Sequence, residues 1–351
     1  MKFESHSFHD NINFFYNASI YSNQSQNISI SSTKNKLIKS HNAGLGKRRL
    51  LESSFGEFYE RYYLQSNGEK NLAIFNMING DIKKINSDLV LFNPNIYNDS
   101  SGAASHNTSA KSIEHAVLEY YERQSLIHTW LNKIPGEIID IENIIKNDKN
   151  IEKKIKFLSH YIDDYIFYNI GLVKDFPVIL AIGKSKKSKA IGLASKENII
   201  MAVNKVIDEM IEGFGYSFNK NEIDSMDEYN DISYSNINNP NLENYIKITP
   251  LKLFEKYNFL FSSEIGAVTY CELIKKNFFI SELLLILKEK FNQDLFVCSV
   301  LKGYLNQKKV VKIYSNEGYP HMFISIFTEK DRKLYGQQNI KNQILDIIPF
   351  P

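Results

Sequence analysis

The sequence predicts an α+β protein in which helices pack on a mixed sheet. Three stretches of the chain repeat apolar residues at helical spacing, and strand-like apolar segments alternate with them. Hydrophobic residues make up 43% of the 351 residues and aromatic residues 13%. That much apolar side-chain surface excludes a disordered chain and is enough for one large domain or two smaller ones.

Residues 1–40 are rich in Asn, Ser and Lys and contain only short apolar clusters such as Phe14–Tyr16. This composition indicates strands or a loosely held segment. We therefore expect a polar N-terminal lead-in over residues 1–40 and the main domain over residues 41–351.

Helical spacing is clearest in three places. The first begins at Leu50, and side chains such as Leu51 and Phe55 recur at three- and four-residue steps on one helix face. The same spacing predicts helices from about Ile113 to Trp130 and from about Glu197 to Phe214.

Shorter apolar runs predict the strands and a further helix over Ser281–Phe291. The predicted strands are Leu89–Phe92, Tyr165–Gly171, Phe176–Ile182, Leu295–Leu301, Lys309–Tyr314 and Met322–Phe327. Residues 217–245 are crowded with Asn, Asp and Ser and predict a polar insertion or long loop. The C-terminal tail from Ile347 to Pro351 should be extended, because its prolines lack the amide donors that a helix or central strand needs.

Charge and composition exclude several classes of protein. The 42 Lys and Arg nearly balance the 40 Asp and Glu, so a general nucleic-acid binder is not expected. The longest apolar run, Phe176–Ile182, is too short to cross a membrane. Cys271 and Cys298 are interpreted as reduced core thiols. Together these features predict a cytoplasmic protein that binds neither nucleic acid nor membrane.

An acidic repeat is the most informative feature of the sequence. The string Glu57-Phe58-Tyr59-Glu60-Arg61 recurs 62 residues later as Glu119-Tyr120-Tyr121-Glu122-Arg123. A weaker third copy is Glu209-Met210-Ile211-Glu212. Only five of the 42 basic residues are Arg. Chance therefore predicts about 0.02 Glu-x-x-Glu-Arg strings, against the two observed.

Glutamates three residues apart project from adjacent turns on one side of a helix, here opposite the apolar stripe. Ser53, one turn before Glu57, joins that face. A single copy is usually ordinary solvated helix surface. Three copies predict that the pairs converge and require a cation between them, for which Mg²⁺ is the natural choice because it prefers carboxylate oxygens. Arg61 and Arg123 are suited to hold phosphate oxygens bidentately.

Small-residue loops precede each of these helices, at Ala43–Lys47, Ser101–Ser105 and Ile191–Ser195. Amide donors at such turns favour an anion. There is no Walker phosphate loop, because Gly183-Lys184-Ser185 has Val178 where the first glycine should stand. Any nucleotide site is therefore of another type. Histidines such as His115, His128, His160 and His321 lack the spacing of metal ligands.

These motifs together resemble the YcaO family, over about Gly44 to Pro351. The resemblance rests on Ser53-x3-Glu57-x2-Glu60-Arg61, on Gly102 through Glu119-x2-Glu122-Arg123, on Gly192 through Glu209-x2-Glu212, and on the Pro-x-Pro terminus. The chain is most similar to the cyclodehydratase subunit of microcin-type thiazole/oxazole synthetases, which also ends in Pro-Phe-Pro.

The resemblance implies that residues 41–351 form an ATP- and Mg²⁺-dependent catalytic domain, with the acidic helices packed around a nucleotide cleft. Such an enzyme phosphorylates the backbone of a ribosomal precursor peptide. It converts Cys, Ser or Thr residues to thiazoline or oxazoline rings during biosynthesis of a peptide antibiotic or toxin. The alternatives are a thioamide- or amidine-forming relative, and a non-catalytic scaffold or allosteric subunit of a peptide-modifying complex.

The resemblance also implies roles for single residues. It assigns Mg²⁺ to Glu57, Glu60, Glu119, Glu122 and Glu209. It assigns nucleotide contacts to Ser53, Glu57, Arg61, Glu119, Arg123, Glu209 and Glu212. Arg61, Arg123 and Pro351 are the expected catalytic residues, and Pro349 would help to order the tail beside the active site. Two residues depart from the family pattern: Glu212 stands where Gln is usual, and Ile347 replaces the first proline of the tail.

The chain has room for the ATP-using portion only, so the resemblance implies partner subunits. We expect a leader-binding or ubiquitin-activating-enzyme-like subunit to present the precursor peptide. A flavin-dependent dehydrogenase would oxidise the azoline to the azole.

Overall fold

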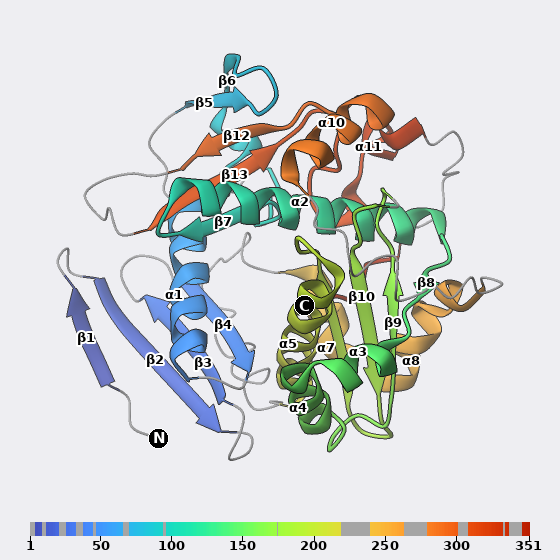
Figure 1. Cartoon of the computed structure of the whole chain (residues 1–351). Helices are drawn as coiled ribbons and strands as arrows, with labels where there is room; N and C mark the ends of the chain where they lie inside the picture. The colour runs from blue at the N-terminus through green and yellow to red at the C-terminus, as the bar shows by residue number, and fades with distance from the viewer. Residues whose placement is uncertain are drawn as a thin grey trace.

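The computed structural model describes residues 4–8, 12–20, 26–32, 38–44, 47–65, 70–93, 96–173, 175–218, 239–262, 279–300, 308–332, 334–336 and 346–351. Its strands form three sheets with helices packed on and between them (Figure 1). The α+β class is confirmed. All strand pairs within the described ranges are antiparallel, so three antiparallel sheets stand in place of the one mixed sheet expected.

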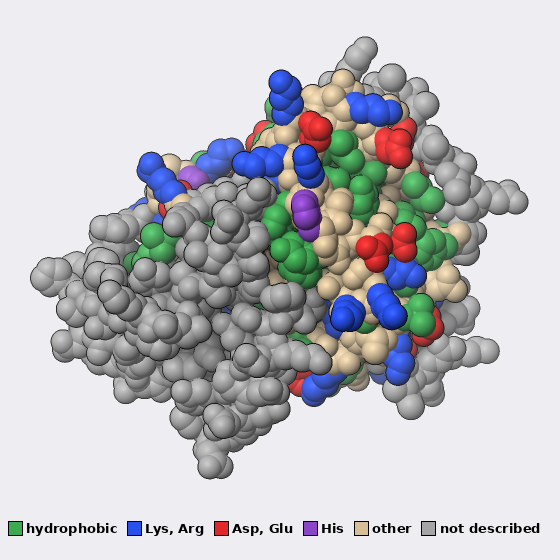
Figure 2. Space-filling view, turned by 90° about the horizontal axis from the view of Figure 1, so that it is seen from below, with side chains coloured by type: hydrophobic (Ala, Val, Ile, Leu, Met, Phe, Trp, Pro, Cys, Tyr) green, Lys and Arg blue, Asp and Glu red, His purple; other side chains and the backbone are tan. Residues whose placement is uncertain are grey.

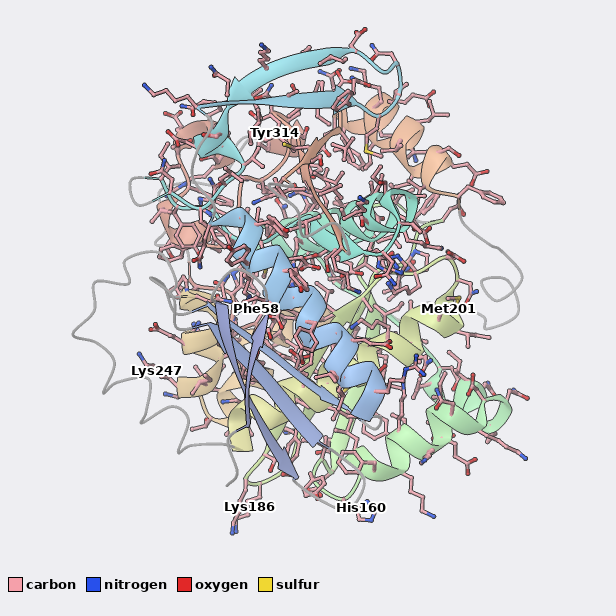
Figure 3. All side chains as sticks on the ribbon, turned by 90° about the vertical axis from the view of Figure 1, so that its left-hand side faces the viewer. Phe58, His160, Lys186, Met201, Lys247 and Tyr314 are labelled. Carbon is pink, nitrogen blue, oxygen red and sulfur yellow. The ribbon has the colours of Figure 1, made fainter. Side chains whose placement is uncertain are left out.

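The first sheet comes from the N-terminal residues. It has the order β1-β2-β3-β4, with bounds Glu4–Phe8, Ile12–Ile20, Gln26–Ser32 and Ile38–Gly44. Helix α1 (Lys47–Leu64) packs on β3 and β4 and also reaches β7 of the second sheet. Figure 3 shows α1 running from beside the N-terminal sheet toward the second sheet, where Tyr314 lies. The helix predicted from Leu50 is thus confirmed.

The second sheet has the order β6-β5-β12-β13-β7. Its strands are β5 (Asn71–Asn76), β6 (Ile82–Asn86), β7 (Ala103–His106), β12 (Phe296–Ser299) and β13 (Lys309–Tyr314). Helix α2 (Ser109–Asn132) packs on β7 and β13, and α10 (Ile280–Phe291) and α11 (Glu329–Arg332) lie close by (Figure 1). The predicted strands near 295–301 and 309–314 and the helix at 281–291 are confirmed.

Two predicted strands are wrong. Residues 89–92 begin at the last residue of a short 3₁₀ turn, η1 (Ser87–Leu89), and 322–327 contain another, η3 (Ile324–Ile326). Apolar side chains of both segments fill gaps in the core: Val90, just after η1, and Ile324 are fully buried. A short buried run has no period that separates a strand from a packed turn. Strand β6 was not predicted, because Lys83 and Lys84 interrupt its apolar residues and most of its side chains are exposed.

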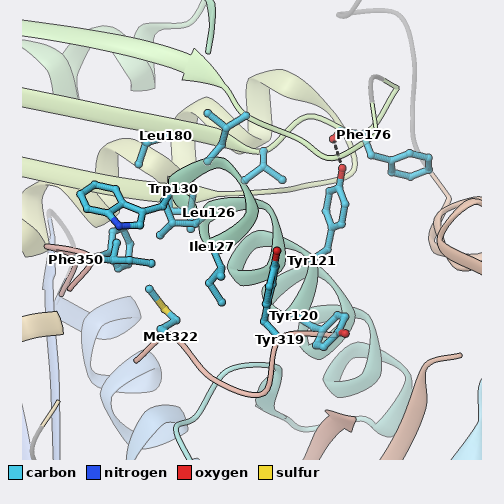
Figure 4. Close-up of a cluster of buried hydrophobic side chains, with 14 of the residues drawn as sticks. Tyr120, Tyr121, Leu126, Ile127, Trp130, Phe176, Leu180, Tyr319, Met322 and Phe350 are labelled. Atoms are coloured by element: carbon cyan, nitrogen blue, oxygen red, sulfur yellow. Dashed lines mark hydrogen bonds between the residues drawn. The ribbon is translucent and has the colours of Figure 1, made fainter. Parts of the chain in front are cut away.

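The third sheet has the order β11-β10-β9-β8 and is buried on both faces. Its strands are β8 (Glu137–Ile138), β9 (Asp164–Asn169), β10 (Ile179–Lys184) and β11 (Lys189–Ala194). Ile179 and Ala181 face the core made with α5 (Ile199–Phe218) and α4 (Lys149–Leu158), next to which lies α3 (Ile141–Asn147). Leu180 and Ile182 face the opposite core with α2, which Figure 4 shows around Trp130. This double burial explains why the predicted strands at 165–171 and 176–182 read as nearly continuous apolar runs.

Residues 219–238 of the predicted polar insertion lie outside the described residues, but both of its ends are helical. Helix α5 continues to Phe218, and α7 (Pro240–Lys247) begins within the polar stretch. The Asn239 side chain caps α7 by accepting from the amides of Asn241 and Leu242. Tyr245, fully buried, anchors the helix. Helix α8 (Pro250–Lys256) and the short turn η2 (Asn258–Ser262) complete this region, whereas η4 (Leu334–Gly336) lies beside α2 and α10 through Tyr335.

Cys298 is buried and makes no disulfide, as expected of a core thiol, and Cys271 lies outside the described residues. In the described ranges, no helix combines the length and the apolar character that crossing a membrane requires. On the face seen from below, basic and acidic side chains are interspersed (Figure 2).

Candidate functional site

Three strand–helix units form a closed ring. Strand β4 leads into α1, β7 into α2, and β11 into α5. Each helix packs on its own strand and also on the strand of the next unit, so α1 contacts β7, α2 contacts β11, and α5 contacts β4. In Figure 1 the three helices surround one region. The three acidic copies in the sequence therefore belong to one arrangement in space.

The second glutamate of a pair ties its unit to the next one. Glu60 on α1 accepts a hydrogen bond from the backbone amide of Ser105 at 2.7 Å. Glu122 on α2 accepts one from the amide of Ser195 at 2.5 Å. The corresponding loop for Glu212, residues 45 and 46, lies outside the described residues. The expectation that these loops offer amides to an external anion is wrong for Ser105 and Ser195, because glutamate carboxylates of the protein already accept from them.

The first glutamate of each pair is held by a cation on its own helix. Arg61 lies 2.5 Å from Glu57, which also accepts a hydrogen bond from Asn42 of β4 at 3.0 Å. Arg123 lies 3.9 Å from Glu119. Glu209 is paired with Lys205, one turn earlier on α5. All three pairs are four residues apart, the spacing at which side chains face each other on a helix.

The six carboxylates lie near enough for each to perturb the pKa of a neighbour. Burial raises the pKa of Glu60 to about 8, with the charge of Glu57 adding to the rise. Burial likewise raises the pKa of Glu122 to about 7, with Glu209 adding to it. The pKa of Glu119 lies well above its ordinary value through burial and the nearby Glu60 and Glu122. The same holds for Glu212, through burial, Glu209 and Glu57. The charge of each glutamate thus affects the pKa of a neighbouring glutamate around the ring.

The glutamate oxygens suit a Mg²⁺ ion that also binds water and phosphate. They suit less well a metal ion held by protein side chains alone. Among the described residues, no three His, Cys, Asp or Glu side chains are grouped closely enough to hold a metal ion. Mg²⁺ usually takes one or two carboxylates, keeps several waters and binds substrate phosphates. Burial is the main cause that raises the pKa of Glu60, Glu119 and Glu122, so these carboxyls favour the protonated form when no cation is bound. A bound divalent cation would stabilise their ionised form, whose oxygens are the ligands that Mg²⁺ prefers.

Two other predicted site residues lie at the edge of the ring. Ser53 is exposed on α1, one turn before Glu57. Pro351 ends the tail and is half-buried.

Side chains of two helices and one connecting residue hold the C-terminal tail against the ring. The backbone oxygen of Asp346 accepts from the Trp130 indole at 3.1 Å, and that of Ile347 accepts from Asn244 at 2.8 Å. The tail then passes Tyr257, between α8 and η2, whose hydroxyl lies 3.5 Å from the Pro349 oxygen. Finally, the Phe350 ring lies 4.9 Å from the guanidinium of Arg123, which also meets the Met322 sulfur. Figure 4 shows Phe350 beside Trp130 and Met322.

Several residues of the site were missed by the sequence analysis. Lys205 had a usable signal, because a basic residue four positions before Glu209 faces it on a helix. Asn42 and Met322 had none, since only the folded chain brings them to Glu57 and Arg123. Phe350 lies in the tail that was expected beside the active site, but its contact with Arg123 was not foreseen.

The raised pKa of Glu60 predicts a pH-dependent stability in magnesium-free buffer. The carboxyl faces Glu57, Arg61, Glu119 and the Ser105 amide. Its folded-state pKa of about 8 exceeds the ordinary value of 4.5. Folding therefore favours the protonated form, and the stability that this proton contributes is lost as the pH rises from about 4.5 through 8.

Glu60→Gln keeps an acceptor for Ser105 but cannot ionise. At pH 8 without metal, we expect the variant to be more stable than the wild type by about 1–2 kcal/mol, and at pH 5 to be equal to it. Urea denaturation at both pH values measures the difference. Equal pH profiles for the two proteins would contradict the assigned environment of Glu60.

Comparison with known proteins adds to this geometry. A family model described as YcaO cyclodehydratase, ATP- and Mg²⁺-binding, matches residues 73–261. None of the curated proteins matches the sequence.

The fold is similar to solved structures at low sequence identity. The microcin synthetase McbBCD complex of Escherichia coli contains a chain with a TM-score of 0.72 and 16% identity, with 96% of each chain covered. A second structure of that complex, with pro-MccB17 bound, has a TM-score of 0.70, 16% identity and 96% coverage of each chain. The YcaO protein of Methanopyrus kandleri, bound with AMPPCP and Mg²⁺, has a TM-score of 0.68 and 13% identity, covering 94% of this chain and 90% of that one.

Proposed function

Because the chain belongs to the YcaO family, we propose that it is a cyclodehydratase that converts Cys, Ser or Thr of a ribosomal precursor peptide to thiazoline or oxazoline rings. ATP and Mg²⁺ are the cofactors of this family. The proposal extends to biosynthesis of a peptide antibiotic or toxin, carried out in the cytoplasm.

The observation that carries the proposal is the ring of six glutamates on α1, α2 and α5. Its second glutamates lock each helix to the next unit through Ser105 and Ser195, so the carboxylates stay close despite their mutual repulsion. Holding like charges together in a buried place costs free energy, and a bound cation recovers it. A purely structural surface would not need such an arrangement.

Each residue then has a proposed role. Glu57, Glu60, Glu119, Glu122 and Glu209 would provide oxygen ligands for Mg²⁺, which with ATP would supply phosphoryl transfer to the peptide amide oxygen. Arg61 and Arg123 would hold phosphate oxygens, since each guanidinium already faces the ring. Ser53 and Glu212 would contact the nucleotide. Glu212 keeps the oxygen acceptor of the usual Gln, and burial with the nearby Glu209 and Glu57 raises its pKa, so its neutral form, like Gln, is favoured there.

The position of the C-terminal tail suggests where the substrate peptide binds. Phe350 packs on Arg123 and Pro351 follows it, so the chain end borders the residue proposed to hold phosphate. We propose that Pro351 and Pro349 keep this end extended, and that the reacting peptide segment lies beside it.

Partner subunits follow from the same proposal. One structure of the E. coli complex contains pro-MccB17, so a comparable precursor peptide is the proposed substrate. A leader-binding or ubiquitin-activating-enzyme-like subunit would present the peptide. A flavin-dependent dehydrogenase would oxidise the rings.

The test combines the purified protein, its partner subunit, ATP, Mg²⁺ and the precursor peptide. We expect phosphate release and a loss of about 18 Da per ring, the mass of the water expelled by condensation. A mass gain from the replacement of oxygen by sulfur would instead indicate thioamide formation. A macrocyclic product would indicate an amidine. Peptide of unchanged mass with ATP present would favour a non-catalytic scaffold or allosteric subunit.

A further inference from the structure

The third unit of the ring holds its cation differently from the first two. Arg61 and Arg123 directly follow the second glutamate of their pairs, whereas Gly213 follows Glu212. The residue that pairs with the first glutamate of α5 is Lys205, one turn toward the helix N-terminus.

Packing explains why no arginine stands at position 213. A Cβ atom built there would lie 2.7 Å from the backbone oxygen of Ile191 and 3.2 Å from its nitrogen. Helix α5 therefore rests directly on β11, and any side chain at this position would push the two elements apart. A cation in this unit must come from another turn, and Lys205 provides it.

A second lysine lies beside the first. Lys196 follows Ser195, whose amide donates to Glu122, so its backbone is fixed next to the ring. The charges of Glu122 and Glu209 attract its ammonium group, and the charge of Lys205 repels it. Arg123 also acts on Glu209. Three cations thus act on the one carboxylate of Glu209, so positive charge is concentrated at this edge of the ring.

Lys205 is also accessible. Its side chain is 37% exposed and that of Glu209 is 29% exposed, so the ammonium can be reached from solvent while it is paired. A lysine ammonium is a compact charge on a flexible stem, and it can turn from a carboxylate to a phosphate oxygen with little loss.

We infer that Lys205, with Lys196 beside it, binds the polyphosphate of ATP and takes in the third unit the role proposed for Arg61 and Arg123 in the other two. The inference rests on the proposed function, because it assigns the ligands of the same site. In this arrangement part of the polyphosphate lies at the Glu209 edge of the ring, beside the carboxylates proposed to hold Mg²⁺.

Isothermal titration calorimetry with Mg²⁺·AMPPCP and with adenosine tests the inference. Lys205→Met should weaken AMPPCP binding about tenfold or more and leave adenosine binding unchanged, because only the phosphates lose a charge-assisted partner. Lys205→Arg should stay within about threefold of the wild type, since it keeps the charge.

Lys247→Met is the matched control. Lys247 pairs with Glu243 at 3.5 Å, also four residues apart on a helix, but both side chains are exposed and neither belongs to the ring. We expect this variant to bind both ligands as the wild type does. If Lys205→Met fails to fold, Lys196→Met carries the same test with the same expected loss of selectivity.

The outcomes separate this inference from the proposed function. If the wild type binds AMPPCP and Lys205→Met binds it equally well, the inference is wrong and the proposed function stands. Parallel loss of AMPPCP and adenosine would assign Lys205 a structural role only, and would also overturn the inference. A wild-type protein that does not bind Mg²⁺·AMPPCP would overturn the proposed function itself.

Discussion

Replacing Glu119 with Gln should lower the rate of peptide cyclodehydration about 100-fold or more, a loss of roughly 2.7 kcal/mol of transition-state stabilisation. Glu119 lies between Glu60 and Glu122 in the ring and is paired with Arg123. Gln has nearly the same size but no charge, so it would weaken a bound Mg²⁺ and leave Arg123 without its partner. The fold should be preserved because the side-chain volume is unchanged.

Glu243→Gln is the control for this variant. Glu243 also forms an ion pair four residues along its helix, with Lys247, but lies in solvent. Phosphate release and peptide mass measure activity, and thermal denaturation checks folding. A Glu119→Gln enzyme with the wild-type rate would exclude this carboxylate from the metal site and would remove the main support for the ring as an active site.

Gly192→Ala should destabilise the protein by about 3 kcal/mol or more, the upper range for overpacking a core. A Cβ atom at this position would overlap the backbone oxygen of Val206 and lie 2.8 Å from the amide nitrogen of Met210. It would also lie 2.9 Å from the Glu209 Cβ. Two of these atoms belong to the α5 backbone, which cannot yield without moving the whole helix. Because α5 carries Glu209 and Glu212, we expect activity to fall together with stability.

Gly80→Ala is the control that separates the destabilisation caused by steric overlap from that caused by backbone strain. Gly80 has a φ of 77°, and a Cβ atom there would meet nothing within 4 Å. Its replacement should cost only about 1 kcal/mol, from the left-handed conformation alone. Chemical denaturation of both variants gives the comparison. Wild-type stability in Gly192→Ala would show that β11 and α5 are not as close as described.

The sequence predicted the long helices well, but it missed the shorter helices α3, α4, α7 and α8 and mistook two turns for strands. Helices α1, α2 and α5 were found because their apolar stripes repeat over many residues. The segments at 89–92 and 322–327 were mistaken for strands because a short buried run looks the same in a turn. Strand β6 was missed because its exposed lysines hide the alternation that marks a half-buried strand.

Within the candidate site, the predictions based on residue spacing within one helix were again the reliable ones. It placed both glutamates of each pair on one helix face, and the structure confirms that α1, α2 and α5 carry them. It did not reveal Lys205 as the partner of Glu209, because the third copy has Gly213 where the first two copies have Arg. Nor could it show that the Phe350 ring covers Arg123, since these residues are 227 positions apart.

The sequence by itself determined which residues repeat and which helices bear them, because helix periodicity acts between residues three and four apart. Only the tertiary structure decided what the repeat does. Glu60 reaches the amide of Ser105 and Glu122 that of Ser195, contacts that span 45 and 73 residues. Such long-range contacts depend on how the sheets stack against α1, α2 and α5, which no local pattern encodes. The close packing of Gly213 on Ile191 likewise moved the third cation to Lys205.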